Sequence, residues 1–163
     1  MKKIIICSTL VLFLSCDSNV RFVSPQPENM QALQRVPAKY HGEYVWEDQS
    51  KDTFIVNANS IIPFGFLSDS LIIKQRGNYL YVNLLQDGAY VLSVVRINQI
   101  LSYQKIVELS NLEIAEDKKH LFNIVEVGAE FFGKPNYLIK QVSVNQLNLL
   151  VNSSQQRQLM KVK

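Results

Sequence analysis

The chain has 163 residues, with 17 Lys and Arg against 14 Asp and Glu. Lys2 and Lys3 lie in an N-terminal segment that we expect to be removed, which leaves 15 basic residues against 14 acidic ones. This near-neutral balance argues against a general nucleic-acid-binding protein, whose surface would be strongly basic. The length suits one domain with a hydrophobic core of its own.

The first 16 residues have the layout of a secretory signal peptide. Lys2 and Lys3 precede an apolar run from Ile4 to Leu14, and Cys16 follows shortly after it. The run has 11 residues, whereas a membrane-spanning helix needs roughly 20. We therefore expect a cleaved signal rather than a membrane-spanning anchor.

The cysteine at the end of this run resembles the lipobox of bacterial lipoproteins. Phe13 and Ser15 occupy the positions where typical lipoboxes carry Leu and a small residue. The resemblance implies that the signal, residues 1–15, is cut off before Cys16 and that Cys16 is acylated, palmitate included. It also implies a location in the cell envelope, on a bacterial membrane whose identity and side stay open. The alternative is a simple secretory signal with an incidental cysteine.

Cysteine chemistry is excluded by this interpretation. Cys7 leaves with the signal and Cys16 carries the lipid, so the mature domain keeps neither a free thiol nor a disulfide. A secreted location permits disulfides without requiring them.

Residues 16–39 are predicted to form a lipid-anchored tether. The residues after Cys16 are polar, and Ser24-Pro25-Gln26-Pro27 disfavours regular structure. A short helix from Glu28 to Arg35 is possible and would end before Pro37, because the residue before a proline avoids the α region. A single β-rich globular domain is then expected from residue 40 to residue 163.

The first two-thirds of this domain are predicted to consist of strands. The turn signals Gly77-Asn78 and Asp87-Gly88 separate apolar and alternating runs and fit two-residue hairpin loops, with Asp-Gly typical of type I′. Close spacing of this kind indicates an antiparallel meander that forms a barrel or a sandwich. The expected strands lie around Tyr44 and Trp46, at Phe54–Val56, Leu71–Arg76, Tyr79–Leu85, Tyr90–Ile97 and Leu101–Leu109.

The last third of the domain is predicted to contain both helices and strands. A helix is predicted over Ala115–Val127, with acidic residues in its first turn, and Ser143-Val144-Asn145-Gln146 fits a capping box that opens another. Strands are expected at Tyr137–Lys140 and Arg157–Lys163. The predicted fold class is therefore mainly β, a β-rich α+β fold with one or two short helices in the C-terminal third.

The two turns also predict which residues pair across the strands. Arg76 faces Tyr79, and Tyr79 faces Arg96; Lys74 faces Tyr81. One face of this meander is then aliphatic and the other is cationic and aromatic. The aliphatic face collects Leu71, Ile73, Leu80, Val82, Leu84, Val91 and Val95, and the opposite face collects Lys74, Arg76, Tyr79, Tyr81, Asn83, Tyr90, Leu92 and Arg96.

The cationic and aromatic face has three interpretations. It could be a solvated outer face, on which Lys and Arg stems cover tyrosine rings. It could be a ligand surface, where Arg76 and Arg96 flank Tyr79 and hold an anionic group while Tyr81 covers an apolar body. It could also be the inside of a barrel. A one-residue slip in register would exchange the two faces.

Catalytic and metal-binding patterns are scarce. His41 and His120 are far apart in sequence and are interpreted as surface residues, and Glu43 and Glu47 as an exposed polar face. Common nucleophile, zinc and phosphate-loop motifs are absent from the sequence. The sequence therefore predicts a non-enzymatic protein with no catalytic residue, no metal site and no cofactor.

The stretch Gly42-Glu43-Tyr44 looks like the opening strand of lipocalin-type barrels, with Tyr44 in place of the usual Trp. Together with Ser24-Pro25-Gln26-Pro27 and Val36-Pro37, it also resembles uncharacterised small bacterial lipoproteins, a resemblance that implies no activity. We therefore expect an envelope interaction or accessory protein, attached to the membrane through Cys16 and binding a partner protein. The alternative is a lipocalin-like binder of a small amphiphilic or anionic ligand.

Overall fold

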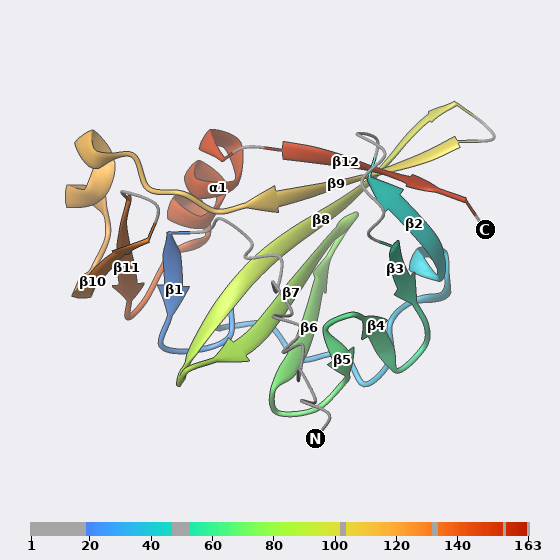
Figure 1. Ribbon diagram of the computed structural model, residues 1–163, viewed down its shortest axis with the longest axis horizontal. Coiled ribbons are helices and arrows are strands. Elements are labelled where there is room, and N and C mark those ends of the chain that lie inside the picture. Colours follow the sequence, from blue (N-terminus) through green and yellow to red (C-terminus); the bar gives the residue numbers. More distant parts are fainter. Residues whose placement is uncertain (1–18, 47–52, 102–103, 132–133, 155, 163) are drawn as a thin grey trace, which may run out of the picture.

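Strands are the main secondary structure of the protein. The computed structural model describes residues 19–46, 53–101, 104–131, 134–154 and 156–162 (Figure 1). Its strands are β1 (Val20–Phe22), β2 (Gly42–Trp46), β3 (Thr53–Val56), β4 (Ser60–Ile62), β5 (Gly65–Phe66), β6 (Leu71–Arg76), β7 (Tyr79–Gln86), β8 (Ala89–Leu101), β9 (Gln104–Asn111), β10 (Ile124–Phe131), β11 (Lys134–Ile139) and β12 (Gln156–Lys161). Its helices are η1 (Ala38–Tyr40), η2 (Glu116–Leu121) and α1 (Val144–Ser153).

Strand β8 organises the sheet. Strand β7 pairs along one edge of β8, whereas β1 and β9 share the opposite edge, β1 at Tyr90 and β9 from Ser93 onward. The strands follow the order β10-β11-β1-β8-β9-β12-β2-β3-β4-β5, and β6 and β7 form a hairpin that branches from β8. Strand β1 is parallel to β11, and the meander from β6 to β9 is antiparallel, as predicted.

The predicted turns at Gly77-Asn78 and Asp87-Gly88 are confirmed, whereas the expected break between Ile97 and Leu101 is wrong, because β8 continues through to Leu101. Asp87 and Gly88 both have positive φ, 50° and 80°, which is the signature of a type I′ turn. In the other turn only Gly77 is positive, at 59°, which fits type II′. With both loops two residues long, the predicted pairs form: Arg76 with Tyr79, Lys74 with Tyr81, Ile73 with Val82, Tyr79 with Arg96, Tyr81 with Val94, Val82 with Ser93, and Leu84 with Val91.

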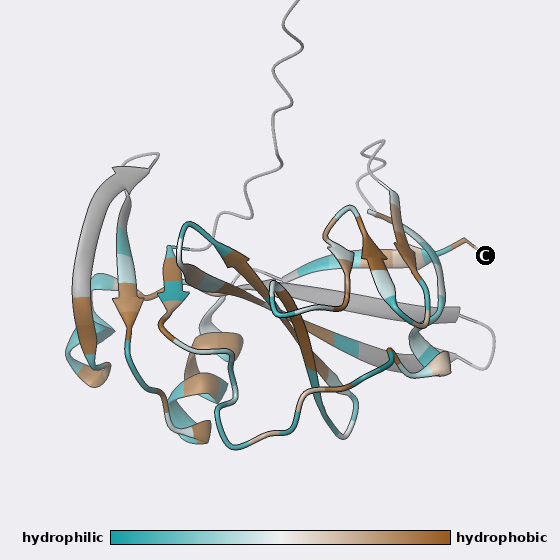
Figure 2. Ribbon diagram, turned by 90° about the horizontal axis from the view of Figure 1, so that it is seen from below, coloured by the Kyte–Doolittle hydropathy of each residue, from teal (hydrophilic) through white to brown (hydrophobic). Residues whose placement is uncertain are grey.

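The strands of the β6–β8 layer are buried on both faces, because each face packs against a different set of elements. Figure 2 shows hydrophobic residues concentrated along the strands and hydrophilic residues at the turns. The first core lies between β6–β7 and the β2–β4 side, and its buried residues are Val36, Tyr40, Tyr44, Trp46, Phe54, Ile61, Leu71, Ile73, Leu80, Val82 and Leu159. The second core lies between β7–β8 and β1, β11 and α1, and its buried residues are Val20, Phe22, Tyr81, Leu92, Val94, Leu112, Ile114, Tyr137, Ile139, Leu147 and Leu150.

The predicted fold class, mainly β with a short helix near the C-terminus, is confirmed, and of the two predicted architectures the sandwich fits. Within the described residues, the two ends of the strand path, β10 and β5, do not pair with each other, so no closed barrel forms. The predicted capping box is also present: Gln146 N donates to Ser143 Oγ at 3.2 Å, and Ser143 N donates to Gln146 Oε1 at 2.8 Å.

The prediction that residues 16–39 are a tether is wrong from residue 19 onward. Asn19 is buried; its side-chain Oδ1 accepts from Ile114 N at 3.0 Å and its backbone O accepts from Tyr137 N at 2.7 Å. Val36 belongs to the first core. The expected helix over Glu28–Arg35 does not form. Proline-rich sequence suggested a linker, but side chains from the sheet satisfy this segment's backbone, as described below.

The predicted helix over Ala115–Val127 is also wrong in its second half. A 3₁₀ helix, η2, covers its start, and its remainder is the strand β10, which pairs with β11. The apolar residues that suggested a helical stripe include Phe122 and Ile124, which pack at the edge of the second core. Tertiary pairing has therefore overridden a local helical pattern.

Candidate functional site

The four residues of the predicted ligand site lie on one face of the β6–β8 layer. Arg76 pairs with Tyr79, and Tyr79 with Arg96, so these three side chains share a face with Tyr81. The rings of Tyr79 and Tyr81 stack with centroids 6.4 Å apart, and the Arg96 guanidinium carbon lies 5.9 Å from the Tyr79 ring centroid. The sequence therefore placed this cluster correctly.

Burial changes what this cluster can do. Tyr81 is only 6% exposed and belongs to the second core, and burial raises the pKa of its hydroxyl although the charge of Arg76 opposes that shift. The interpretation of this face as a solvated outer surface is wrong, because β1, β11 and α1 cover it. Arg76 is exposed at its rim. A ligand-binding role for Arg76, Tyr79, Tyr81 and Arg96 stays a prediction.

Two polar residues on the same face hold the proline-rich segment. Lys74 Nζ donates to Pro25 O at 2.8 Å and to Pro27 O at 2.7 Å. Asn83, which has no exposed surface, accepts from Gln26 N at 2.6 Å and donates to Gln26 O at 2.9 Å. Burial lowers the pKa of Lys74, although the nearby charge of Glu28 opposes that shift. These side chains replace the backbone partners that a neighbouring strand would supply.

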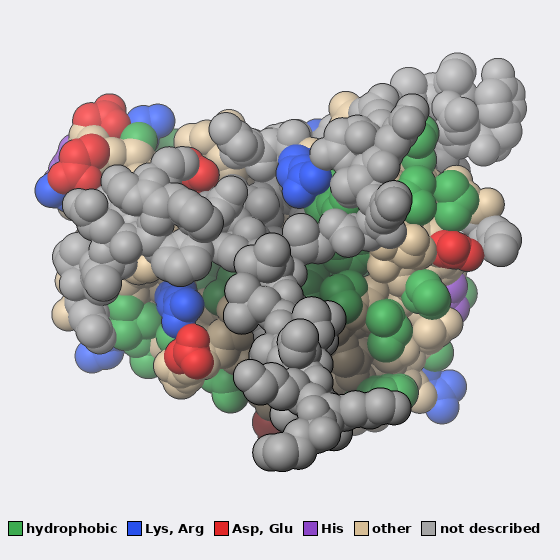
Figure 3. All heavy atoms as spheres, in the orientation of Figure 1, with side chains coloured by type: hydrophobic (Ala, Val, Ile, Leu, Met, Phe, Trp, Pro, Cys, Tyr) green, Lys and Arg blue, Asp and Glu red, His purple; other side chains and the backbone are tan. Residues whose placement is uncertain are grey.

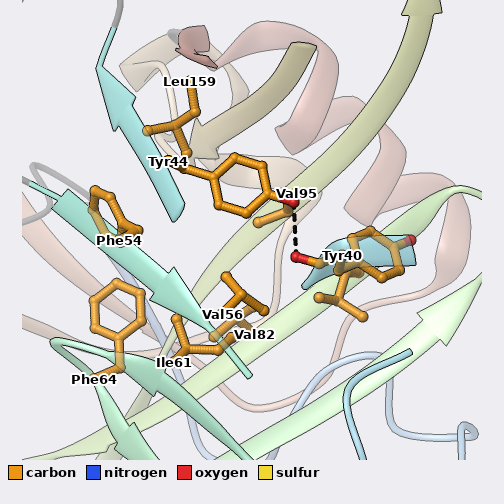
Figure 4. A pocket seen from close by; sticks show the side chains of 10 residues that line it. Tyr40, Tyr44, Phe54, Val56, Ile61, Phe64, Val82, Val95 and Leu159 are labelled. Atoms are coloured by element: carbon orange, nitrogen blue, oxygen red, sulfur yellow. Dashed lines mark hydrogen bonds between the residues drawn. The ribbon is translucent and has the colours of Figure 1, made fainter. Parts of the chain in front are cut away.

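A small apolar cavity of about 40 Å³ lies in the first core (Figure 4). Its tyrosine hydroxyls are bonded to backbone, since Tyr44 Oη donates to Tyr40 O at 2.7 Å and Tyr40 Oη donates to Asn78 O at 3.1 Å. Burial raises the pKa of Tyr40 and of Tyr44 to about 12. The cavity is lined by Tyr40, Tyr44, Phe54, Val56, Ile61, Phe64, Leu80, Val82, Val95 and Leu159.

An exposed apolar surface covers the outer side of the strands that enclose this cavity. On β3 and β4, Ile55 pairs with Ile62, and on β5 Phe66 pairs with Ser60 and so shares the face of Ile62. Met160 of β12 lies on the same face, since it pairs with Val45, which pairs with Thr53, two residues before Ile55; Val162 follows two residues after Met160. We call these residues the apolar outer face, with exposed fractions of 41% for Ile55, 40% for Ile62, 73% for Phe66, 40% for Met160 and 50% for Val162.

The apolar outer face was missed from the sequence. Hydrophobic side chains are visible at the surface in Figure 3, on the side where β2–β5 lie in Figure 1. The adjacent pair Ile61 and Ile62 was the available signal, because in a strand neighbouring residues point to opposite faces. Ile61 is in the first core, so Ile62 must point outward.

The remaining candidates lie apart from these sites. His41 Nε2 bonds Val36 O at 2.8 Å, and His120 is exposed on η2. Among the described residues, no three His, Cys, Asp or Glu side chains come together to bind a metal ion. That part of the chain also contains no helix of the length and hydropathy needed to cross a membrane. Cys16 lies outside the described residues, so its acylation stays a prediction.

Comparison of the chain with protein-family models, with curated proteins and with solved structures gave no match.

Proposed function

We propose that the protein is a lipoprotein of the cell envelope, held on a bacterial membrane by lipid on Cys16, and that it acts as a non-enzymatic interaction or accessory protein. The lipobox-type segment that ends at Cys16 supports the anchor. The apolar outer face supports the interaction role.

The apolar outer face is the observation that carries the interaction role. Large apolar side chains on the surface are ordinary when they are scattered, but a contiguous group marks an interaction site. Here Ile55, Ile62 and Phe66 lie on the neighbouring strands β3, β4 and β5, and Met160 and Val162 lie beyond β2 on the same sheet face; Phe66, the most exposed, is on the edge strand β5. A large, highly exposed aromatic side chain within such a group is a typical anchor for a partner protein.

We propose an envelope protein with a complementary apolar surface as the occupant of this face. Figures 1 and 2 show β1, which follows Cys16 closely in sequence, toward one end of the long axis and β2–β5 toward the other. An anchor at the β1 end would attach the domain away from the end of the long axis that carries the apolar outer face. A protein, rather than lipid, is then the partner within its reach.

Photo-crosslinking in intact cells tests the interaction role. A benzophenone side chain at position 62 should give a discrete adduct larger than the chain, and Phe66→Ser should abolish it while the domain stays folded. The same probe at Leu149, an exposed residue of α1, is the matched control and should not give this adduct. No adduct at position 62, or one with the mass of two chains, would contradict an envelope partner on this face.

Membrane fractionation tests the anchor. Cys16→Ser should release the protein into the soluble fraction, because stable anchoring takes at least two acyl chains and the lipoprotein-type modification supplies them. Cys7→Ser is the matched control, since Cys7 leaves with the signal, and it should stay in the membrane fraction. A Cys16→Ser protein that still sediments with membranes would rule out lipid as the main anchor.

The binder of a small amphiphilic or anionic ligand is the second candidate, supported by the apolar cavity in the first core. Cavities that hold drug-sized ligands are of roughly 300–1,000 Å³, so this one accepts a small apolar group rather than a whole amphiphile. Ligand binding is therefore ranked below partner binding.

A further inference from the structure

We infer that the folded domain rests directly on the membrane surface, with the N-terminal end of β1 and the segment before η2 facing the lipid headgroups. The inference rests on the proposed acylation of Cys16 and adds the orientation and distance of the domain. It follows from how soon after Cys16 the chain enters the fold.

Asn19, the first residue that the structure describes, is three residues after Cys16 and is bonded to the body of the domain. The Asn19 side chain accepts from Ile114 N and its backbone O accepts from Tyr137 N, so both of its acceptor groups are bonded to the body of the domain. Asn19 is 7% exposed. A residue this buried, with one hydrogen bond to its side chain and one to its backbone, fixes the position of the chain at this point.

Strand β1, which follows Asn19, also holds the N-terminal segment to the body of the domain. Val20 and Phe22 are fully buried in the second core, and β1 pairs with β11 on one edge and with β8 on the other. A pull on the N-terminus is therefore resisted by two neighbouring strands. The segment cannot lengthen into a tether without breaking the second core.

The chain between Cys16 and Asn19 can span little distance. Three residues reach at most roughly 10–11 Å when fully extended. Because acyl chains on Cys16 would lie in the bilayer, Asn19 must stay within about that distance of the headgroups. Ile114, which is bonded to Asn19, must lie equally close to the headgroups. Ala115, the next residue, is exposed and lies there too.

Charge does not set this orientation. The neighbouring helix η2 carries Glu116 and Asp117 as well as Lys118 and Lys119, so its charges nearly balance. Attraction to anionic lipid would be screened by salt, whereas a short covalent link is not. We therefore expect the same orientation on neutral lipid and at high salt.

Energy transfer to labelled lipid tests the inference. The lipidated chain is reconstituted in phosphatidylcholine vesicles with an acceptor dye on some headgroups, and a donor dye is attached to Ala115→Cys or, as the matched control, to Asn59→Cys. Asn59 is exposed in the loop between β3 and β4. Transfer should be strong from position 115 and weak from position 59, and it should not change with salt.

A spacer variant makes the test specific. About ten Gly and Ser residues inserted between Ser18 and Asn19 add a mean length of roughly 17 Å. The insertion should leave vesicle flotation intact and remove most of the difference between the two positions. A chain that floats with vesicles but shows equal transfer from both positions before the insertion would overturn the inference alone. A chain that does not float with vesicles would overturn the proposed anchor as well.

Discussion

The side chain of Asn83 pairs with both backbone groups of Gln26, as a residue of a neighbouring strand would. Gln26 N donates to Asn83 Oδ1 at 2.6 Å, and Asn83 Nδ2 donates to Gln26 O at 2.9 Å. Neither residue has exposed surface. One buried amide thus fastens a proline-rich segment to the middle of the sheet.

Asn83→Ala should lower the free energy of unfolding by about 2–4 kcal/mol, because it leaves a buried N–H and a buried C=O of Gln26 without their partner. Urea unfolding measures the change. Asn59→Ala, at an exposed loop position, should stay within about 0.5 kcal/mol of the wild type. An Asn83→Ala protein as stable as Asn59→Ala would contradict the role given to this amide.

Lys74→Met should loosen the proline-rich segment while leaving the β6–β8 hairpins intact. The substitution keeps an apolar stem but removes the two hydrogen bonds to Pro25 O and Pro27 O. Hydrogen exchange should rise over residues 23–36 and stay unchanged in β7. Lys118→Met, at an exposed position on η2, serves as the control. Equal exchange in both variants would show that Lys74 does not hold the segment.

Alkaline pH should destabilise the protein through its buried tyrosines. Burial raises the pKa of Tyr40 and Tyr44 to about 12, and the hydrogen bond to Glu116 raises the pKa of Tyr137 to about 12, against 10.0 for an unperturbed tyrosine. In this range the native state binds more protons than the unfolded state, so stability falls as pH rises. The contribution is complete below pH 10 and is lost between about pH 10 and 12.

Urea unfolding between about pH 9 and pH 12, which covers the window set by these pKa values, measures this loss. Tyr44→Phe should reduce the pH dependence, because it removes one of the shifted groups, and should cost about 1 kcal/mol at neutral pH through the lost bond to Tyr40 O. A pH profile identical to that of the wild type would contradict the assignment of Tyr44.

Filling the cavity in the first core should stabilise the protein. Val82→Ile adds one methylene at a buried position on its wall. At roughly 24 cal/mol per Å³ of cavity, complete filling is worth about 1 kcal/mol, and Val82→Ile should recover part of it in a thermal unfolding measurement. A lower melting temperature would show that the cavity walls cannot accommodate the group.

Native mass spectrometry decides between the two proposed functions. The mature domain with Cys16→Ser, purified gently from its own envelope, should give a clean mass without ligand if partner binding is correct. A reproducible extra mass that disappears in Arg76→Ala or Val82→Ile would favour the ligand binder instead. At Tyr81 the variant to use is Tyr81→Phe rather than Tyr81→Ala, because Tyr81 is buried in the second core.

The β6–β8 layer was predictable because its information is local. Gly77-Asn78 and Asp87-Gly88 set the loop lengths, and loop length sets the register of a hairpin. Given the register, alternation assigns every side chain to a face, and the cluster of Arg76, Tyr79 and Arg96 follows. Nothing in the alternation reveals what covers a face, so the burial of Tyr81 under β1 and α1 could not be predicted.

The prediction that the N-terminal segment is a tether was wrong for the opposite reason: the residues that bond to this segment are distant from it in sequence. Ser24-Pro25-Gln26-Pro27 lacks the pattern of a strand or a helix, and its hydrogen bonds come from Lys74 and Asn83, about fifty residues later. Helical spacing around Phe122 was misleading in a similar way, since the strand β10 depends on its pairing with β11. Sequence patterns report periodicity and turns but not long-range pairing.

The pairing of β1 with β11 also sets an order for folding. Val20 lies opposite Tyr137 in the sheet, so β1, the first strand of the described residues, completes its pairing only after β11 has been synthesised. Contacts between residues so far apart in sequence form slowly. Under the proposed export across a membrane, this delay would be useful: the edge of β1 that pairs with β11 stays open until Tyr137 has also crossed.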